Sequence, residues 1–254
     1  MKNIEMFVIT HKDLFVTIPE GYKVIGVGEY GLKNQNTILS DSINNNISVK
    51  NPNYCELTAI YWLWKNYDLP DYVGICHYRR FFVHGLFSRV MKLDTISSIL
   101  NNYDVILPKK VRNNPDVWHY FVNSISGYEH DLLSLEKLIK DEYNDYYESF
   151  EEVMHSNAIS YCNMCVMSKK DFNSYCEWLF ELLSKYEQCV DLSGYTQQEQ
   201  RIYGFMSEFL INVWVKKNNK RTKYVNSMLF TTNIFTNFLK KVKILLKGIS
   251  SNVE

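Results

Sequence analysis

Residues 72–81 read Tyr-Val-Gly-Ile-Cys-His-Tyr-Arg-Arg-Phe, a short apolar run that leads directly into a cluster of cations. The run follows the turn signal Asp68-Leu69-Pro70-Asp71, and its length and composition are typical of a buried strand. In open α/β sheets, ligands collect beyond the carboxyl ends of the strands. We therefore expect residues 72–77 to form a central strand whose last residue, His77, opens a ligand site.

Further apolar runs of strand length lie on both sides of this segment, at residues 4–9, 22–27, 103–108 and 161–168. A polar, Asn-rich loop is expected over residues 33–53. Helical spacing of apolar residues predicts helices, the first capped by Asn53, at 54–66, 93–102, 127–141, 143–154, 171–186, 196–218 and 233–249. Strands that alternate with helices predict an α/β domain with a mostly parallel sheet.

Length and charge limit the classes of protein that this chain can belong to. Its 254 residues suit one α/β domain, which we expect over residues 1–225, followed by a tail over 226–254. Lysine plus arginine and aspartate plus glutamate each number 28, so the balanced charge argues against a dedicated nucleic-acid binder. No apolar run approaches the ~20 residues of a membrane-spanning helix, and no secretory signal is expected.

The cysteines are expected to be reduced thiols, because a chain without a secretory signal stays in the cytoplasm. Cys162 and Cys165 form a Cys-x-x-Cys that we place inside the strand at 161–168, where positions three apart point to opposite faces. No second pair completes a zinc site, so these thiols are interpreted as structural.

Two groups of polar residues could carry chemistry. His77, Arg79 and Arg80 suit a phosphate or diphosphate, because guanidinium groups match phosphate oxygens bidentately; the alternative is a surface cluster paired with local acids. The stretch Asn46-Ile47-Ser48-Val49-Lys50-Asn51 leads into Tyr54-Cys55-Glu56 at a helix N-terminus, which can bind sugar hydroxyls or an anion. Its alternative is a capped loop in which asparagine serves turn geometry.

Familiar catalytic signatures are missing from the sequence. It contains no Gly-x-Gly-x-x-Gly, no Walker loop, no Gly-x-Ser-x-Gly and no His-Glu-x-x-His. No Asp-x-Asp follows residues 72–77, where a metal-dependent nucleotide-sugar transferase would carry it, and cations occupy that place. A leaving nucleoside diphosphate needs its charge neutralised by a divalent metal or by fixed positive side chains.

Several motifs, taken in order, resemble one enzyme family. They are Thr10-His11-Lys12, Asn46-Ile47-Ser48, Lys50-Asn51, Tyr54-Cys55-Glu56-Leu57-Thr58, Tyr61-Trp62, Trp64-Lys65-Asn66, His77-Tyr78-Arg79-Arg80-Phe81, Asn163-Met164, Tyr175-Cys176, Trp178-Leu179-Phe180, Arg201, Gly204-Phe205 and Ser207-Glu208. Over residues 4–215 the pattern resembles bacterial capsule, exopolysaccharide and O-antigen glycosyltransferases related to β-galactofuranosyltransferases. It departs from them at Ala59, where glycine is common, and at Phe209, where arginine is common and a charge near the site is lost.

The resemblance implies a GT-A-like fold, a UDP-sugar donor with galactofuranose as one candidate, a glycan or undecaprenyl-linked acceptor, and no divalent metal. We hypothesise that His77, Tyr78, Arg79 and Arg80 hold the diphosphate, that His11, Asn46, Lys50 and Glu56 contact the nucleotide or sugar, and that Asn163 and Arg201 shape the acceptor side. An inverting transfer needs a carboxylate base, for which the candidates are Glu208 first, then Asp41 and Glu199. The alternatives are a non-catalytic glycan- or nucleotide-binding module and a retaining hexosyltransferase of the same fold.

The tail outside the resemblance has a basic amphipathic pattern. Its apolar stripe consists of Phe235, Phe238, Leu239, Val242, Leu245, Leu246 and Ile249, with Lys240, Lys241, Lys243 and Lys247 around it. Such a helix suits an anionic membrane surface, which predicts a cytoplasmic protein held at the inner face of the cell membrane. The alternative is a helix that packs on the domain's own core.

Overall fold

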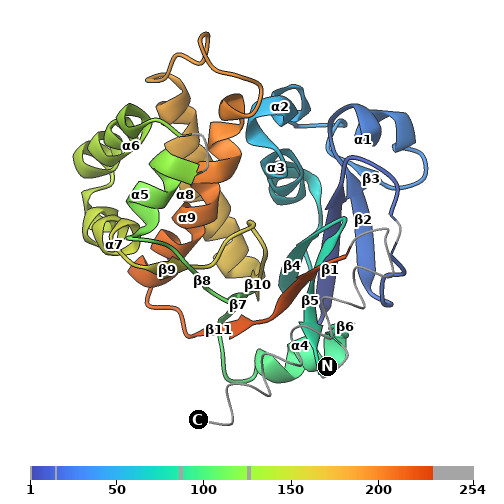
Figure 1. Cartoon of the computed structure of the whole chain (residues 1–254). Helices are drawn as coiled ribbons and strands as arrows, with labels where there is room; N and C mark the ends of the chain where they lie inside the picture. The colour runs from blue at the N-terminus through green and yellow to red at the C-terminus, as the bar shows by residue number, and fades with distance from the viewer. Residues whose placement is uncertain (1, 15, 86–87, 125–126, 231–254) are drawn as a thin grey trace.

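The computed structural model describes residues 2–14, 16–85, 88–124 and 127–230, and Figure 1 shows this part of the chain as a sheet with helices on both of its faces. The strands along the main path of the sheet follow the order β11-β7-β10-β4-β1-β2-β3. They are β1 (Ile4–Thr10), β2 (Tyr22–Gly26), β3 (Leu39–Ser40), β4 (Tyr72–His77), β7 (Val105–Pro108), β10 (Cys165–Ser168) and β11 (Thr222–Val225). Among these strands β10 runs against its two neighbours and the other pairings are parallel, so the predicted α/β fold is confirmed.

Shorter strands extend the sheet beside β4. The strand β5 (Arg80–His84) pairs with the end of β4, with β6 (Arg89–Val90) and with β12 (Ser227–Leu229). A separate two-stranded sheet joins β8 (Val111–Arg112) to β9 (Ala158–Ile159). Because β12 belongs to the main sheet, the folded domain continues to Leu229, past the predicted boundary at residue 225.

The two faces of β1 enter two different cores, as the alternation of side chains along a strand requires. Phe7 and Ile9 face the larger core, whereas Met6 and Val8 face the smaller one. The larger core is covered by α3 (Leu57–Asn66), α5 (Val117–Ser124), α6 (Glu129–Glu142), α7 (Asn144–Met154), α8 (Lys169–Glu187) and α9 (Ile202–Lys217). The smaller core is covered by α4 (Leu93–Ile99) on the other side of the sheet.

The helix α9 is buried on nearly all sides, which is the expected position of a helix that is apolar all round. Phe209 on this helix packs against Phe121 and Phe150 in the larger core. The expectation that this position bears on the charge of the site is therefore wrong, because its ring points into the core. Neighbouring positions of α9 face the other way, toward the end of the sheet.

The predicted helix at 54–66 is interrupted. A short helix, α2 (Asn51–Tyr54), ends at Cys55, whose φ of 52° takes the chain out of the helical conformation, and α3 begins at Leu57. The predicted capping role of Asn53 is wrong, because its amide donates to the carbonyl of Gln200 instead, 3.0 Å away. The break directs Cys55 and Glu56 toward the sheet edge.

The predicted strand at 161–168 is shorter than expected, since β10 begins only at Cys165. Cys162 and Asn163 lie before it with φ values of 81° and 47°, so this Cys-x-x-Cys does not lie within one strand. A positive φ is uncommon for residues other than glycine, and nothing in the local sequence signals it. Cys162 and Cys165 are free thiols, as predicted.

Two further differences concern connecting segments. The predicted loop at 33–53 contains the end of α1 (Gly28–Asn34), then β3, a turn of 3-10 helix η1 (Ser48–Lys50) and the start of α2, while α5 was missed by the sequence patterns. The predicted helix at 196–218 divides into η2 (Glu199–Arg201) and α9. Within the described ranges no helix is both long and apolar enough to cross a bilayer, and the predicted tail helix at 233–249 lies outside those ranges.

Candidate functional site

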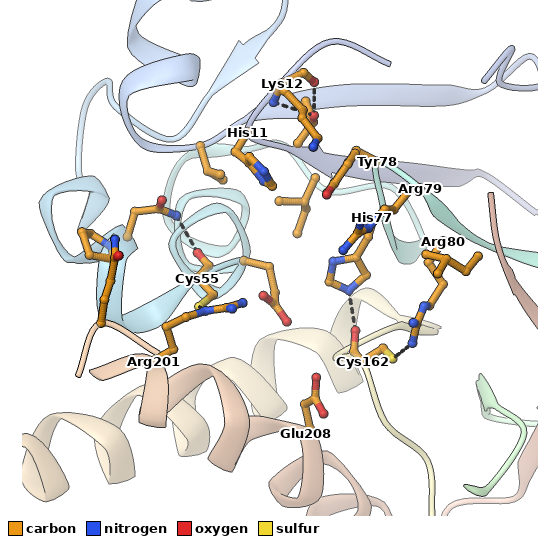
Figure 2. A pocket seen from close by; sticks show the side chains of 18 residues that line it. His11, Lys12, Cys55, His77, Tyr78, Arg79, Arg80, Cys162, Arg201 and Glu208 are labelled. Carbon is orange, nitrogen blue, oxygen red and sulfur yellow. Dashed lines mark hydrogen bonds between the residues drawn. The ribbon is translucent and has the colours of Figure 1, made fainter. Parts of the chain in front are cut away.

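A cavity of about 740 Å³ opens at the carboxyl ends of β1 and β4 (Figure 2). Its volume falls within the roughly 300–1,000 Å³ of small-molecule sites. The position agrees with the expectation that ligands of an α/β sheet bind beyond its strand ends. The lining is mostly polar: Thr10, His11, Lys12, Asn51, Cys55, Glu56, His77, Tyr78, Arg79, Arg80, Cys162, Gln197, Arg201 and Glu208, with Ile9, Val27, Pro52 and Leu229.

The His-Tyr-Arg-Arg segment forms one wall through a tight turn. His77 ends β4 and pairs with Arg80 at the start of β5, so Tyr78 and Arg79 are the two residues of a hairpin turn. Tyr78 is buried, and its ring supports two cations, with Arg79 5.2 Å and Lys12 5.0 Å from the ring centroid. The hairpin therefore fixes where these charges enter the cavity, because cations are attracted to an aromatic face.

Four cationic side chains line the cavity: Lys12, Arg79, Arg80 and Arg201. In the part of the chain that the structure describes, none of them lies within salt-bridge distance of a carboxylate. Burial, followed by the charges of Lys12, Arg79 and Arg201, lowers the pKa of His11. The cavity is thus a region of positive potential that favours an anionic ligand.

Two carboxyl groups, those of Glu56 and Glu208, lie in the same cavity. Figure 2 shows Glu208 pointing from α9 into the space between Arg201 and His77. Burial raises the pKa of Glu208 to about 8, and the charge of Glu56 contributes to the rise. The backbone N–H of Cys162 and the charges of Arg80 and Arg201 act in the opposite direction. Such a carboxyl group can exchange a proton near neutral pH, as a general acid or base must.

Two cysteines hold two of the arginines. The Nε of Arg201 donates to the Sγ of Cys55 at 3.2 Å, and Arg80 donates to the Sγ of Cys162. Burial raises the pKa of each thiol to about 11. Both are therefore protonated at neutral pH, which argues against a nucleophilic thiolate. A side chain at position 204 would crowd Cys55, because its Cβ would lie 3.1 Å from the Cys55 Sγ. Gly204 leaves room for the contact between Cys55 and Arg201.

The cavity brings together eight of the residues predicted from the sequence: His11, Glu56, His77, Tyr78, Arg79, Arg80, Arg201 and Glu208. Asn163 lies directly behind the wall, 2% exposed, with its Nδ2 2.8 Å from the Glu56 Oε1. Asn163 contacts a carboxylate of the pocket but does not itself line the pocket. Its predicted role on the acceptor side stays a prediction.

Asn46 and Lys50 do not line the cavity, in contrast to the prediction that they contact the donor. The side chain of Asn46 stabilises its own loop, accepting from the Ser48 N–H at 3.1 Å and donating to the Asn44 carbonyl at 2.8 Å. Lys50 forms an ion pair with Glu187, 2.5 Å away on α8. Of the predicted donor contacts in this part of the chain, Glu56 lines the cavity, together with the neighbouring Cys55.

Asp41 and Glu199, the lower-ranked candidates for a base, also lie outside the cavity lining. Asp41 is fully buried and accepts hydrogen bonds from the Gly28 N–H at 3.0 Å and the Ser48 hydroxyl at 2.9 Å. Glu199 accepts from the Thr196 N–H at 2.7 Å and from the Tyr128 hydroxyl at 2.9 Å. Both carboxylates serve local structure, which leaves Glu208 as the first candidate for the base.

Sequence reasoning assigned no site role to Lys12, Cys55 or Gln197 and interpreted Cys162 as a structural thiol, although all four line the cavity. Lys12 could have been found from its place next to His11 after β1. Cys162 gave no signal, because the turn that brings it to the cavity has no local sequence mark. Over the described ranges, no three His, Cys, Asp or Glu side chains lie close enough together to hold a metal ion.

Residues 5–220 match the family described as "Domain of unknown function (DUF4422)". The chain belongs to this family. No curated protein shows a significant match to it. A similar solved structure is the apo structure of the WbbM bifunctional glycosyltransferase, with a TM-score of 0.79 and 26% sequence identity.

This similarity covers 91% of the chain described here and 46% of the WbbM chain, so the chain spans less than half of that protein. The predicted GT-A-like fold with its mostly parallel central sheet is confirmed by this comparison. The finer relationship to β-galactofuranosyltransferases stays a prediction.

Proposed function

We propose that this chain is a glycosyltransferase of surface-polysaccharide biosynthesis that transfers a hexose from a UDP-sugar to a glycan or lipid-linked acceptor. The observation that carries the proposal is the meeting of four cations, which have no carboxylate partner among the described residues, with the carboxyl group of Glu208 in one cavity at the strand ends. The similarity to a solved glycosyltransferase supports the general class. Galactofuranose is one candidate for the sugar, on the family resemblance alone.

In this proposal the cations hold the diphosphate of the donor. Arg79 and Arg80 present guanidinium groups from the hairpin, which suit phosphate oxygens because they donate two parallel hydrogen bonds. Arg201 and Lys12 lie on other walls of the cavity and add charge. Fixed positive charge stabilises the negative charge that develops on the leaving diphosphate.

Glu208 is proposed as the base of an inverting transfer. The acceptor hydroxyl oxygen attacks the anomeric carbon and forms the new glycosidic bond, while the bond from that carbon to the diphosphate oxygen breaks and UDP leaves with its electron pair. The hydroxyl proton passes to the ionised form of Glu208. A pKa of about 8 lies close to the range in which a base is both available and strong enough.

The first prediction tests diphosphate binding. Replacing Arg79 or Arg80 by alanine is expected to weaken UDP binding by about tenfold or more, because a charge-assisted hydrogen bond contributes about 1.5–3 kcal/mol. Isothermal titration with UDP measures the effect. The control is Arg221→Ala, since Arg221 is an exposed arginine paired with Asp104 at 2.7 Å and lies outside this cavity. Unchanged affinity in both folded variants would show that the diphosphate binds elsewhere.

The second prediction concerns metals. We propose that the His-Tyr-Arg-Arg cations replace a metal at the end of β4, so transfer should continue in excess EDTA. Measuring product formation with EDTA, and again after adding Mn²⁺, checks this. Complete loss with EDTA and recovery with Mn²⁺ would mean that carboxylates build a metal site during turnover.

Attachment to the membrane through residues 234–249 also stays a prediction, which sedimentation with anionic liposomes can check.

A further inference from the structure

Two consecutive residues at the edge of the cavity have left-handed backbone conformations. Cys162 has φ 81° and Asn163 has φ 47°, immediately before β10. Asparagine tolerates this region better than most residues, but cysteine is not among those enriched there. Such conformations cost free energy and persist where surrounding contacts determine them, which is often at functional sites. The contacts of this turn are therefore informative.

Cys162 contacts three residues of the cavity through three different atoms. Its carbonyl accepts a hydrogen bond from the Nε2 of His77, and its Sγ accepts one from Arg80. Its backbone N–H faces the carboxyl group of Glu208 and acts to lower the pKa of that group. Figure 2 shows the contacts to His77 and Arg80 as dashed lines, with Glu208 beside them. A single residue thus joins the end of β4, the start of β5 and α9.

Asn163 holds the second carboxylate. Its Nδ2 lies 2.8 Å from the Glu56 Oε1, 2.7 Å from the Ser207 hydroxyl and 3.1 Å from the Gly204 carbonyl. A carboxylate can only accept hydrogen bonds, so the amide nitrogen rather than the oxygen faces Glu56. The Asn163 Oδ1 is buried and has no hydrogen-bond partner among the described residues.

The orientation of the Asn163 amide is set at its donor end. A buried acceptor without a partner costs free energy. In Asn163 the donor end is directed toward a pocket carboxylate, while the acceptor end stays unsatisfied. The Asn163 amide therefore holds Glu56 in position while one of its own polar atoms has no partner among the described residues.

We infer that the turn Cys162–Asn163 is the positioning element of the site, which holds Glu56 in place and aligns His77 and Arg80 beside Glu208. Two carboxylates in one cavity repel each other, and the amide donor of Asn163 keeps Glu56 in its place against that repulsion. The consequence of this inference for catalysis rests on the proposed transferase activity. The effect of an Asn163 substitution on the titration of Glu208 does not depend on that activity.

The test uses Asn163→Asp, which keeps the size of the side chain and suits a left-handed backbone. It removes the donor to Glu56 and adds a negative charge beside the two carboxylates. A nearby like charge raises the pKa of an acid, so the titration midpoint of Glu208 is expected to rise by about 1 pH unit or more. The acidic limb of the pH profile of turnover should move upward by the same amount.

The midpoint can be measured without any turnover. The unfolding free energy of each protein, wild type or Asn163→Asp, is measured against pH with Glu208 and again with Glu208→Gln. The difference between the two curves changes with pH and becomes constant above the folded-state pKa of Glu208. The control is Asn66→Asp on α3, because the amide of the half-buried Asn66 likewise donates two hydrogen bonds, to the carbonyls of Asn45 at 2.7 Å and Trp62 at 3.0 Å. The control should lower the melting temperature and leave the midpoint unchanged.

A midpoint that does not move in Asn163→Asp, with a lowered melting temperature, would overturn the inference, since Asn163 would then act on stability alone. If Asn163→Asp does not fold, Asn163→Gly retains the backbone conformation and removes the amide. Its turnover is expected to fall by about 10²-fold, as for a small misplacement of reacting groups, with UDP affinity little changed. Undiminished turnover would overturn the inference. A wild-type chain that transfers no sugar would remove the proposed function, and the titration alone would then decide this inference.

Discussion

Replacing Glu208 by glutamine is expected to lower turnover by about 10²–10⁴-fold, the usual contribution of a general base. Glutamine keeps the size of the side chain but cannot take the proton of the acceptor hydroxyl. Affinity for UDP should change little, because the base acts on the acceptor and the cations hold the diphosphate. Steady-state kinetics of UDP release and direct UDP titration measure the two quantities separately.

A matched control for this substitution is Glu142→Gln. Glu142 is exposed at the end of α6, paired with Lys185 at 2.8 Å and outside the cavity. The control should retain turnover. A Glu208→Gln variant with full turnover and normal folding would show that another group accepts the proton, and Glu56, the other carboxylate of the cavity, would then be the next candidate.

The same substitution is expected to stabilise the protein, and more at pH 8 than at pH 5. The folded-state pKa of Glu208 is raised from 4.5 to about 8, so the unfolded chain loses this proton at a lower pH than the folded chain does. Between these values the folded state binds more protons, and the unfolding free energy falls as pH rises. Glutamine stays neutral, so the variant does not lose this stability.

The expected gain at pH 8 is about 2–3 kcal/mol, which is less than the full shift at about 1.4 kcal/mol per pKa unit, because Glu208 keeps some access to solvent through the cavity. At pH 5, which is just above the unfolded-state value, the gain should be below about 1 kcal/mol. Urea denaturation of both proteins across this pH range measures the difference. A variant that is equally or less stable at pH 8 would contradict the buried, proton-retaining state of Glu208.

The sequence predicted the parts of the site that depend on local patterns. The apolar run at 72–77 and the cations after it predicted β4 and the wall of the cavity, because strand composition and turn signals act over a few residues. Motifs after β1 and across η2 and α9 supplied His11, Arg201 and Glu208 through the family resemblance. The general α/β arrangement followed from the alternation of strands and helices.

The remaining parts depend on contacts between distant segments. The left-handed turn at Cys162 and Asn163 is held by residues of β4, β5 and α9, which no local pattern at 161–168 can reveal. Asn46 and Lys50 are held by their own loop and by α8, and the break at Cys55 brings Cys55 to the cavity beside the expected Glu56. The raised pKa of Glu208 comes from burial in the folded protein. Because apolar residues surround α9, its sequence has no amphipathic pattern that would show which face lines the cavity.

The most direct test of the proposed function is product formation from UDP-hexoses, UDP-galactofuranose among them, with a glycan or lipid-linked acceptor. Our account predicts UDP release that requires the acceptor, and a glycosidic product with inverted anomeric configuration by NMR. A product with retained configuration would contradict the role of Glu208 as the base of a single displacement. UDP binding without any sugar transfer across these donors and acceptors would contradict the account and identify a non-catalytic nucleotide-binding module.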